Sequence, residues 1–146
     1  MPQDVPTRAA YVAWRTATTR WRDDDAYGHL NNATYYELFD TAVNAYLYEA
    51  TGLDVRALPQ IGVVAETGCR YFREIGFPQP IEMGLVVDKV GTSSIVYRIG
   101  LFQGDADEAA AEGRFVHVYV DNTDPARRVV EMPAEIRDAV TPLLRS

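Results

Sequence analysis

Apolar residues between positions 33 and 50 recur every three or four residues, the spacing of a helix with one apolar face. Leu38 and Ala45 widen this stripe, so we expect a helix of about five turns that is enclosed on most of its sides. Gly52 follows it and is the residue type that commonly ends a helix. The stripe consists of Tyr35, Tyr36, Phe39, Ala42, Val43, Tyr46, Leu47 and Ala50.

Strands are predicted on both sides of this helix, where β-branched and aromatic residues cluster between turn residues. A polar end at residues 1–10 is expected to be loose, and a strand follows at residues 11–22. The last long strand carries apolar residues on both faces and should be covered on both sides. Pro133 is expected in the first turn of a terminal helix. The strands after the helix are expected at residues 61–74, 80–90, 92–103 and 109–120, with a short further pairing at 127–131.

This order of elements predicts an α+β protein, in which one antiparallel sheet buries its apolar face around a single helix. The 146 residues show no repeat and match the size of one domain, so we expect a single domain over residues 1–146. One helix leaves the edges of such a sheet open, and pairing with a second copy would cover them. A homodimer or homotetramer is therefore expected.

Charge and composition limit the classes of binding partner that the chain can have. The chain has 21 acidic and 14 basic residues, and its net charge of −7 argues against a nucleic acid or an anionic membrane as partner. Neither a signal peptide nor an apolar run of about 18 residues is present. Cys69 is the single cysteine, which excludes an internal disulfide and is best explained as a structural thiol. We expect a cytoplasmic protein.

Candidate chemistry is concentrated in Trp21-Arg22-Asp23-Asp24-Asp25-Ala26-Tyr27-Gly28-His29-Leu30-Asn31-Asn32, directly before the predicted helix. A carboxylate there lies beside unpaired N–H groups and the positive end of the helix dipole. Acyl transfer needs such a pairing of a base with an oxyanion donor. Ordinary turn chemistry with an asparagine cap explains the same residues as well.

A calcium loop of the EF-hand type is a further alternative for this segment. Asp23, Asp25 and Gly28 fall at its first, third and sixth positions. Its fifth and twelfth positions are Tyr27 and Thr34, and the glutamate required at the twelfth is absent. We expect no metal ion.

The segment Asp23 to Tyr35 resembles the hotdog-fold acyl-CoA thioesterases of the 4-hydroxybenzoyl-CoA thioesterase-like family. That family carries the pattern Asp-x-Asp-x-x-Gly-His-x-Asn-Asn-x-x-Tyr, which this chain reproduces without a gap. The resemblance implies a hotdog fold, an antiparallel sheet wrapped around one long central helix. The likeness continues in Tyr71-Phe72-Arg73, Gly91-Thr92-Ser93-Ser94, Ala111-Glu112-Gly113, His117-Val118-Tyr119-Val120-Asp121 and Met132-Pro133.

The same resemblance implies hydrolysis of a thioester to a free acid and coenzyme A. The family's catalytic carboxylate falls on Asp25, which would attack the thioester carbonyl or activate a water as general base. The thioester oxygen would accept a hydrogen bond from the backbone N–H of Asn32, and a change of its side chain would act only through capping. His29 and Asn31 would support these two groups, with protonation of the leaving thiolate by His29 as the alternative to a positioning role.

Substrate-binding positions are also implied. Coenzyme A is part of the substrate, and no separate cofactor is expected. Arginine side chains suit the phosphates of coenzyme A, and Arg98, Arg127 and Arg128 are options beside the two arginines named below. The polar turn after Val90 suits the pantetheine arm. Another branch takes its carboxylate from the helix, which makes Glu37, Asp40 and Glu66 weaker competitors of Asp25. The substrate-binding candidates are Gly28, Tyr35, Glu66, Arg70, Arg73, Ser93 and Ser94.

Two other functions stay open. A non-catalytic hotdog protein would bind an acyl-CoA or an acyl carrier and leave the thioester intact. A hydratase or dehydratase would need an acid–base pair for C–O chemistry, for which we find no pattern. Among the remaining polar residues, Asp23 should hold the loop, Asp24 should face solvent, and His117 should be a satisfied structural histidine.

Overall fold

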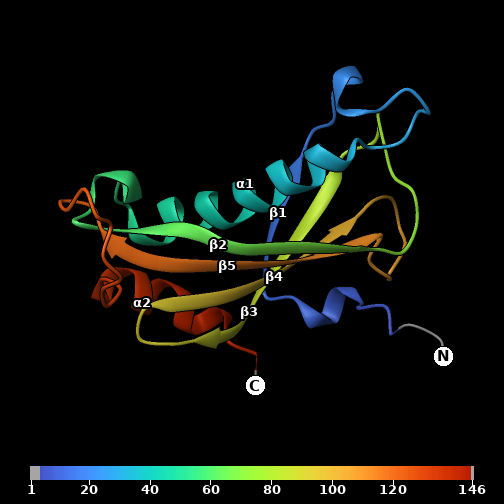
Figure 1. Cartoon of the computed structure of the whole chain (residues 1–146). Helices are drawn as coiled ribbons and strands as arrows, with labels where there is room; N and C mark the ends of the chain where they lie inside the picture. The colour runs from blue at the N-terminus through green and yellow to red at the C-terminus, as the bar shows by residue number, and fades with distance from the viewer. Residues whose placement is uncertain (1–3, 146) are drawn as a thin grey trace.

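Helix α1 spans Asn32–Thr51 and lies along one face of a sheet in the computed structural model, which describes residues 4–145 (Figure 1). Asn31 begins it, because its side-chain oxygen accepts a hydrogen bond from Ala33 N at 3.0 Å. Gly52 ends it with a φ of 69°, in the left-handed region that glycine adopts at low cost. The predicted helix and its terminating glycine are confirmed.

The sheet has five antiparallel strands in the order β1-β3-β4-β5-β2. The strands β1 and β2, which flank α1 in the sequence, therefore form the two edges of the sheet. The four strands predicted after the helix are confirmed within a few residues, and an antiparallel sheet packed on one long helix is the expected hotdog arrangement. The strands are β1 (Ala13–Ala17), β2 (Gln60–Tyr71), β3 (Ile81–Val90), β4 (Ser94–Phe102) and β5 (Ala111–Asp121).

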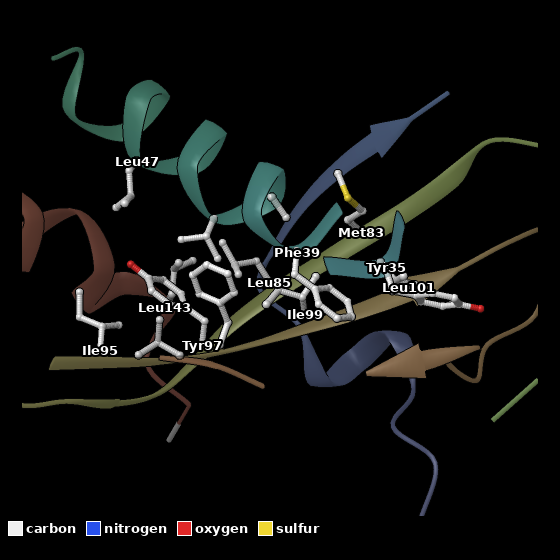
Figure 2. Close-up of a cluster of buried hydrophobic side chains, with 14 of the residues drawn as sticks. Tyr35, Phe39, Leu47, Met83, Leu85, Ile95, Tyr97, Ile99, Leu101 and Leu143 are labelled. Carbon is white, nitrogen blue, oxygen red and sulfur yellow. The ribbon is translucent and has the colours of Figure 1, made fainter. Parts of the chain in front are cut away.

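The core lies between α1 and the sheet, where the labelled side chains of the helix and the strands meet (Figure 2). Alternate residues of β4, such as Tyr97 and Ile99, point to this side and are fully buried. Phe39 of α1 is also fully buried and lies over Gly113 of β5. A Cβ on Gly113 would come within 2.5 Å of the Phe39 ring, so the glycine allows the close approach of α1.

The N-terminal segment packs on the other face of the sheet (Figure 1). Tyr11 lies over Gly84 and Gly100, and its hydroxyl donates a hydrogen bond of 2.5 Å to Glu112. Arg8 N donates to the backbone of the loop before β5. The expected loose end is therefore wrong for residues 4–10, because these contacts hold it; residues 1–3 lie outside the described residues.

Several boundaries differ from the prediction. The strand expected at 11–22 ends at Ala17, and a 3₁₀ turn at Trp21–Asp23 follows it. Within 127–131 the backbone forms one isolated bridge, between Val120 and Val129, in place of a strand. Helix α2 spans Ala134–Val140, and Pro133 precedes it as the capping residue. Of the helices in residues 4–145, none is long and apolar enough to cross a membrane.

Coverage of the elements is less complete than expected. Glu37, Asp40 and Glu49 are exposed on the outer side of α1, so its expected enclosure on most sides is wrong for this chain. Val116 and Val118, on the outer face of β5, are only half-buried. Helix α1, with the short α2 beside it, covers one face of the sheet, and the N-terminal segment covers only part of the other.

Gly113→Ala should lower the free energy of unfolding by about 1–3 kcal/mol, because the new methyl group has to displace Phe39 from a packed core. Gly68→Ala is the matched control: it lies in the neighbouring strand β2, and its Cβ would meet no heavy atom within 4 Å. Urea unfolding of both variants tests this. Equal stability would mean that α1 moves away from the sheet without cost.

Candidate functional site

The loop between β1 and α1 folds back so that its two ends meet. The carbonyl of Asp23 accepts a hydrogen bond of 2.8 Å from Asn31 N, and Asp25 N donates to the His29 carbonyl at 2.7 Å. Gly28 makes the turn with a φ of 81°. These bonds fix the acidic segment directly against the first turn of α1.

The three adjacent aspartates have separate partners. Asp23 is 6% exposed and paired with Arg20, at 2.9 Å between Oδ1 and Nη2. Asp24 accepts a hydrogen bond of 3.1 Å from Phe77 N, so the expectation that it faces solvent is wrong: it is half-buried and holds the loop before β3. Because the carboxylates diverge, they do not form a calcium loop. Residues 4–145 contain no cluster of three His, Cys, Asp or Glu side chains suited to a metal ion.

Asp23 is a charged anchor of the loop. Burial alone would raise the pKa of its carboxyl group, but the hydrogen bonds and the positive charge of Arg20 outweigh burial and lower the pKa below its usual value. Arg20 donates from its backbone N–H at 2.7 Å and from its guanidinium. This agrees with the structural role expected for Asp23.

Asp25 is held by the backbone of its own loop. Its Oδ1 accepts hydrogen bonds from Tyr27 N at 2.8 Å and from His29 N at 3.2 Å. No donor among residues 4–145 engages Oδ2. Asp25 also lines a pocket of about 580 Å³, together with Trp21 and Gly28. A pocket of this size suits a small-molecule ligand.

The first turn of α1, to which the loop is tied through Asn31, supplies a further N–H donor, although none of the α1 residues lines the pocket of Asp25. Asn31 caps the helix, and the Asn32 side chain does not. The Asn32 side chain accepts a hydrogen bond from the Tyr71 hydroxyl of β2. The backbone N–H of Asn32 has no acceptor among residues 4–145, as is usual for the first N–H groups of a helix.

Tyr35 connects the loop to the sheet. It is buried, and its ring meets Tyr71 edge-on at 4.9 Å between centroids. Burial, followed by the nearby Cys69, Asp25 and Glu74, raises the pKa of Tyr35 to about 12, so its hydroxyl is neutral at physiological pH. Burial also raises the pKa of the Cys69 thiol to about 11, which agrees with a structural thiol.

His29 acts on Asp25 through its backbone N–H, whereas its ring lies elsewhere. The ring Nε2 is 2.9 Å from Glu74 Oε2, and the side chain is half-exposed. The predicted residues that the structure brings together at the start of α1 are Gly28, Asp25, His29, Asn31, Asn32 and Tyr35.

Three other predicted residues lie away from this group. Glu66 is on the face of β2 turned away from α1, where it pairs with Arg114. Arg70 is on the same face, with Nη2 3.3 Å from Glu112 Oε1. Arg73 donates to the Glu108 carbonyl at 2.9 Å.

Ser93 and Ser94 lie at the far end of the sheet. Ala111 of β5 pairs with Tyr71 of β2 on one side and with Leu101 of β4 on the other, so these three residues mark the end of the sheet near the loop. Ser94 lies seven residues before Leu101 along β4. Seven residues of strand span about 23 Å. Within one chain, these serines therefore do not reach the loop of Asp25.

Two features were missed from the sequence. Trp21 falls within the strand predicted at residues 11–22, yet it is 81% exposed, meets Phe77 edge-on at 5.9 Å and lines the pocket of Asp25. Its position beside the acidic run was the available signal. His117 is buried as expected, but its Nδ1 has no partner among residues 4–145, so it is not satisfied.

Asp23→Asn should reduce the acid sensitivity of folding. Because the folded pKa of Asp23 is lowered, its contribution is present above the unfolded pKa and is lost as the pH falls through the folded pKa. The stability gap between wild type and variant should narrow from about pH 5 downward. Urea unfolding over this range measures it, with the exposed turn residue in Asp105→Asn as control. A gap that is the same at every pH would contradict the prediction.

Comparisons with known proteins agree with this architecture. Residues 19–140 match the family model of the Thioesterase-like superfamily. The crystal structure of the PA5185 protein from Pseudomonas aeruginosa is 48% identical, over 98% of this chain and 99% of that chain, with a TM-score of 0.92. A comparison with curated protein sequences found no match.

Two more distant structures share the fold. Slr0204, a 1,4-dihydroxy-2-naphthoyl-CoA thioesterase from Synechocystis, is 12% identical over 89% of this chain and 96% of that chain, with a TM-score of 0.79. The gentisyl-coenzyme A thioesterase BH1999 is 17% identical over 88% and 100%, with a TM-score of 0.76. With the family match over most of its length, this chain belongs to the thioesterase-like superfamily.

Proposed function

We propose that this protein is an acyl-CoA thioesterase that hydrolyses its substrate to a free acid and coenzyme A. One observation carries the proposal: Asp25 is fixed by two backbone N–H groups beside a pocket, next to a helix N-terminus whose Asn32 N–H is unpaired among residues 4–145. The activities of Slr0204 and BH1999, both thioesterases of CoA substrates, support the substrate class.

Asp25 acts on the thioester carbonyl in one of two ways. As nucleophile, its oxygen attacks the carbonyl carbon, the C–S bond breaks with release of the CoA thiolate, and water hydrolyses the mixed anhydride. As general base, it takes a proton from water, whose oxygen attacks and expels the same thiolate. Both routes consume one water and pass through a tetrahedral oxyanion, and neither needs a metal ion or cofactor.

The oxyanion is stabilised at the start of α1. The N–H of Asn32 and the positive end of the helix dipole are fixed before the reaction begins, and one such donor lowers the barrier by about 3 kcal/mol. His29 and Asn31 are positioning residues. His29 orients Asp25 through its N–H, and Asn31 holds the first turn of the helix as its cap.

We also propose that two copies pair along β2, as a dimer or as two such pairs in a tetramer. β2 is the last strand of the sheet order, and Val63 and Val64 on it are exposed. Antiparallel pairing of two β2 edges is symmetric and would cover them. It would also place the partner's Ser93–Ser94 turn on the side of the Asp25 loop.

Arg70 and Arg73 of β2 and the segment after it remain our candidates for binding the CoA phosphates.

Asp25→Asn should reduce turnover by a factor of about 10² to 10⁴, because the amide neither attacks the carbonyl nor takes a proton. Its oxygen can still accept the N–H bonds of Tyr27 and His29, so the loop should keep its shape. Thiol release from short, long and aromatic acyl-CoAs measures the effect.

Asp24→Asn is the matched control for this experiment, because Asp24 lines the same pocket and its amide oxygen can still accept from Phe77 N. It should retain activity. Wild-type turnover in Asp25→Asn would refute the assignment of Asp25. Saturable binding of intact thioesters without release by the wild type would show a non-catalytic binding protein.

Val64→Lys should weaken the pairing of copies, since it places a charge on the exposed edge strand of both. Sedimentation equilibrium should give two chains, or a multiple, for the wild type and a shift toward one chain for the variant. Val12→Lys, beside β1 at the opposite edge, is the control and should assemble as the wild type does. A wild type that sediments as one chain would overturn the proposed pairing.

A further inference from the structure

A second pocket lies under the C-terminal half of α1, between the helix, the start of β2 and β5. Its volume is about 130 Å³. Leu47, Tyr119 and Ile136 are buried in its wall, and the exposed Arg56 lies at its rim, so it opens to the surface. Asn44 also lines it, 13 residues along α1 from the Asn31 cap, which corresponds to about 20 Å. Within one chain, the pocket is therefore separate from that of Asp25.

His117 is the polar group in the wall of this pocket. Its side chain is 3% exposed, and its Nδ1 has no hydrogen-bond partner among residues 4–145. Burial lowers the pKa of His117 to about 4, so its imidazole is neutral at physiological pH. A buried polar atom without a partner is unfavourable, and a ligand that pairs with it gains that free energy.

Gly62 keeps this nitrogen accessible. Gly62 and His117 both line the pocket, and a Cβ on Gly62 would come within 2.9 Å of His117 Nδ1 and 3.1 Å of the Tyr119 ring. The rings of His117 and Tyr119 stand edge-on, with centroids 6.3 Å apart. The pocket is close in volume to an apolar cavity of about 150 Å³ that holds one benzene molecule.

We propose that this pocket binds a compact, neutral ligand with one aromatic ring and one hydroxyl group, whose hydroxyl pairs with His117 Nδ1. The volume admits one ring, and the aromatic side chains of the wall, His117 and Tyr119, favour a planar one. A hydroxyl can both donate and accept, so it matches either tautomer of the neutral imidazole. A carboxylate would meet no opposing charge on His117.

Titration of the full-length protein with phenol, toluene and benzoate, followed by NMR of the Gly62 amide and the His117 ring nitrogens, tests the proposal. Phenol should shift both signals saturably and bind about tenfold more tightly than toluene, the effect expected of one hydrogen bond. Benzoate should bind more weakly than phenol.

Variants separate the cavity from the hydrogen bond. Gly62→Ala should abolish binding of phenol and toluene, whereas Gly68→Ala on the same strand should bind as the wild type does, because its methyl group meets nothing within 4 Å. His117→Phe keeps a ring but removes the nitrogen, so this variant should bind phenol and toluene with about equal affinity.

Three results would overturn the inference. The first is the absence of saturable shifts, which would mean that water alone fills the pocket. The second is equal affinity of the wild type for phenol and toluene. The third is a set of shifts centred on Asp25 with Gly62 unmoved. The preference for phenol over toluene is compared between wild type and His117→Phe, without the Gly62→Ala variant. The proposal can therefore be tested even if Gly62→Ala folds poorly.

Discussion

The distance between α1 and the sheet is set where the ring of Phe39 rests on the bare Cα of Gly113. The candidate site depends on this distance. Tyr71 extends from β2 to the Asn32 side chain, and Tyr35 of α1 stacks edge-on against Tyr71. A helix held further from the sheet would lose both contacts, and its first turn would no longer be fixed beside the acidic loop. A packing constraint in the core thus positions polar groups at the surface.

Three aspartates in succession show how backbone geometry assigns different chemistry to identical side chains. Asp23 points to a guanidinium and is a charged anchor; Asp24 accepts from a backbone N–H 53 residues away and joins two loops. Asp25 accepts from the N–H groups of its own turn, and one of its oxygens stays free of donors among residues 4–145. Asp24 and Asp25 both line the pocket with one oxygen free of donors among residues 4–145, but Asp25 alone is held by two N–H groups of the turn that closes against α1.

Most of the fold could be predicted from the sequence because its signals are local. The spacing of apolar residues in α1, the terminating Gly52 and the turn residues between strands lie within a few residues of the elements they define. The loop could be found because its residues are consecutive. What covers an apolar surface is not a local property, so the exposure of the outer side of α1 was missed.

The same limit applies to side chains whose partners are distant in sequence. The contact of Asp24 with Phe77 joins loops before α1 and before β3, and the position of Trp21 depends on where the first strand ends. Burial of His117 follows from its apolar strand, but whether its nitrogen finds a partner depends on Gly62, from another strand. The roles of Asp25 and its neighbours stay predictions, since geometry gives positions and only kinetics gives rates.

The hydrogen bond between Asp23 and Asn31 closes the base of the loop, so substitutions at the tip of the loop and substitutions at its base have different consequences. Tyr27 is 84% exposed and holds Asp25 through its backbone N–H, so its side chain, like that of Ala26 in the pocket wall, is free to vary. Substitutions at Ala26 would reshape the pocket wall and substitutions at Tyr27 the exposed surface next to it, in both cases without disturbing the carboxylate. In evolutionary terms, ligand preference can drift at the tip of the loop while the reacting geometry at its base stays under purifying selection.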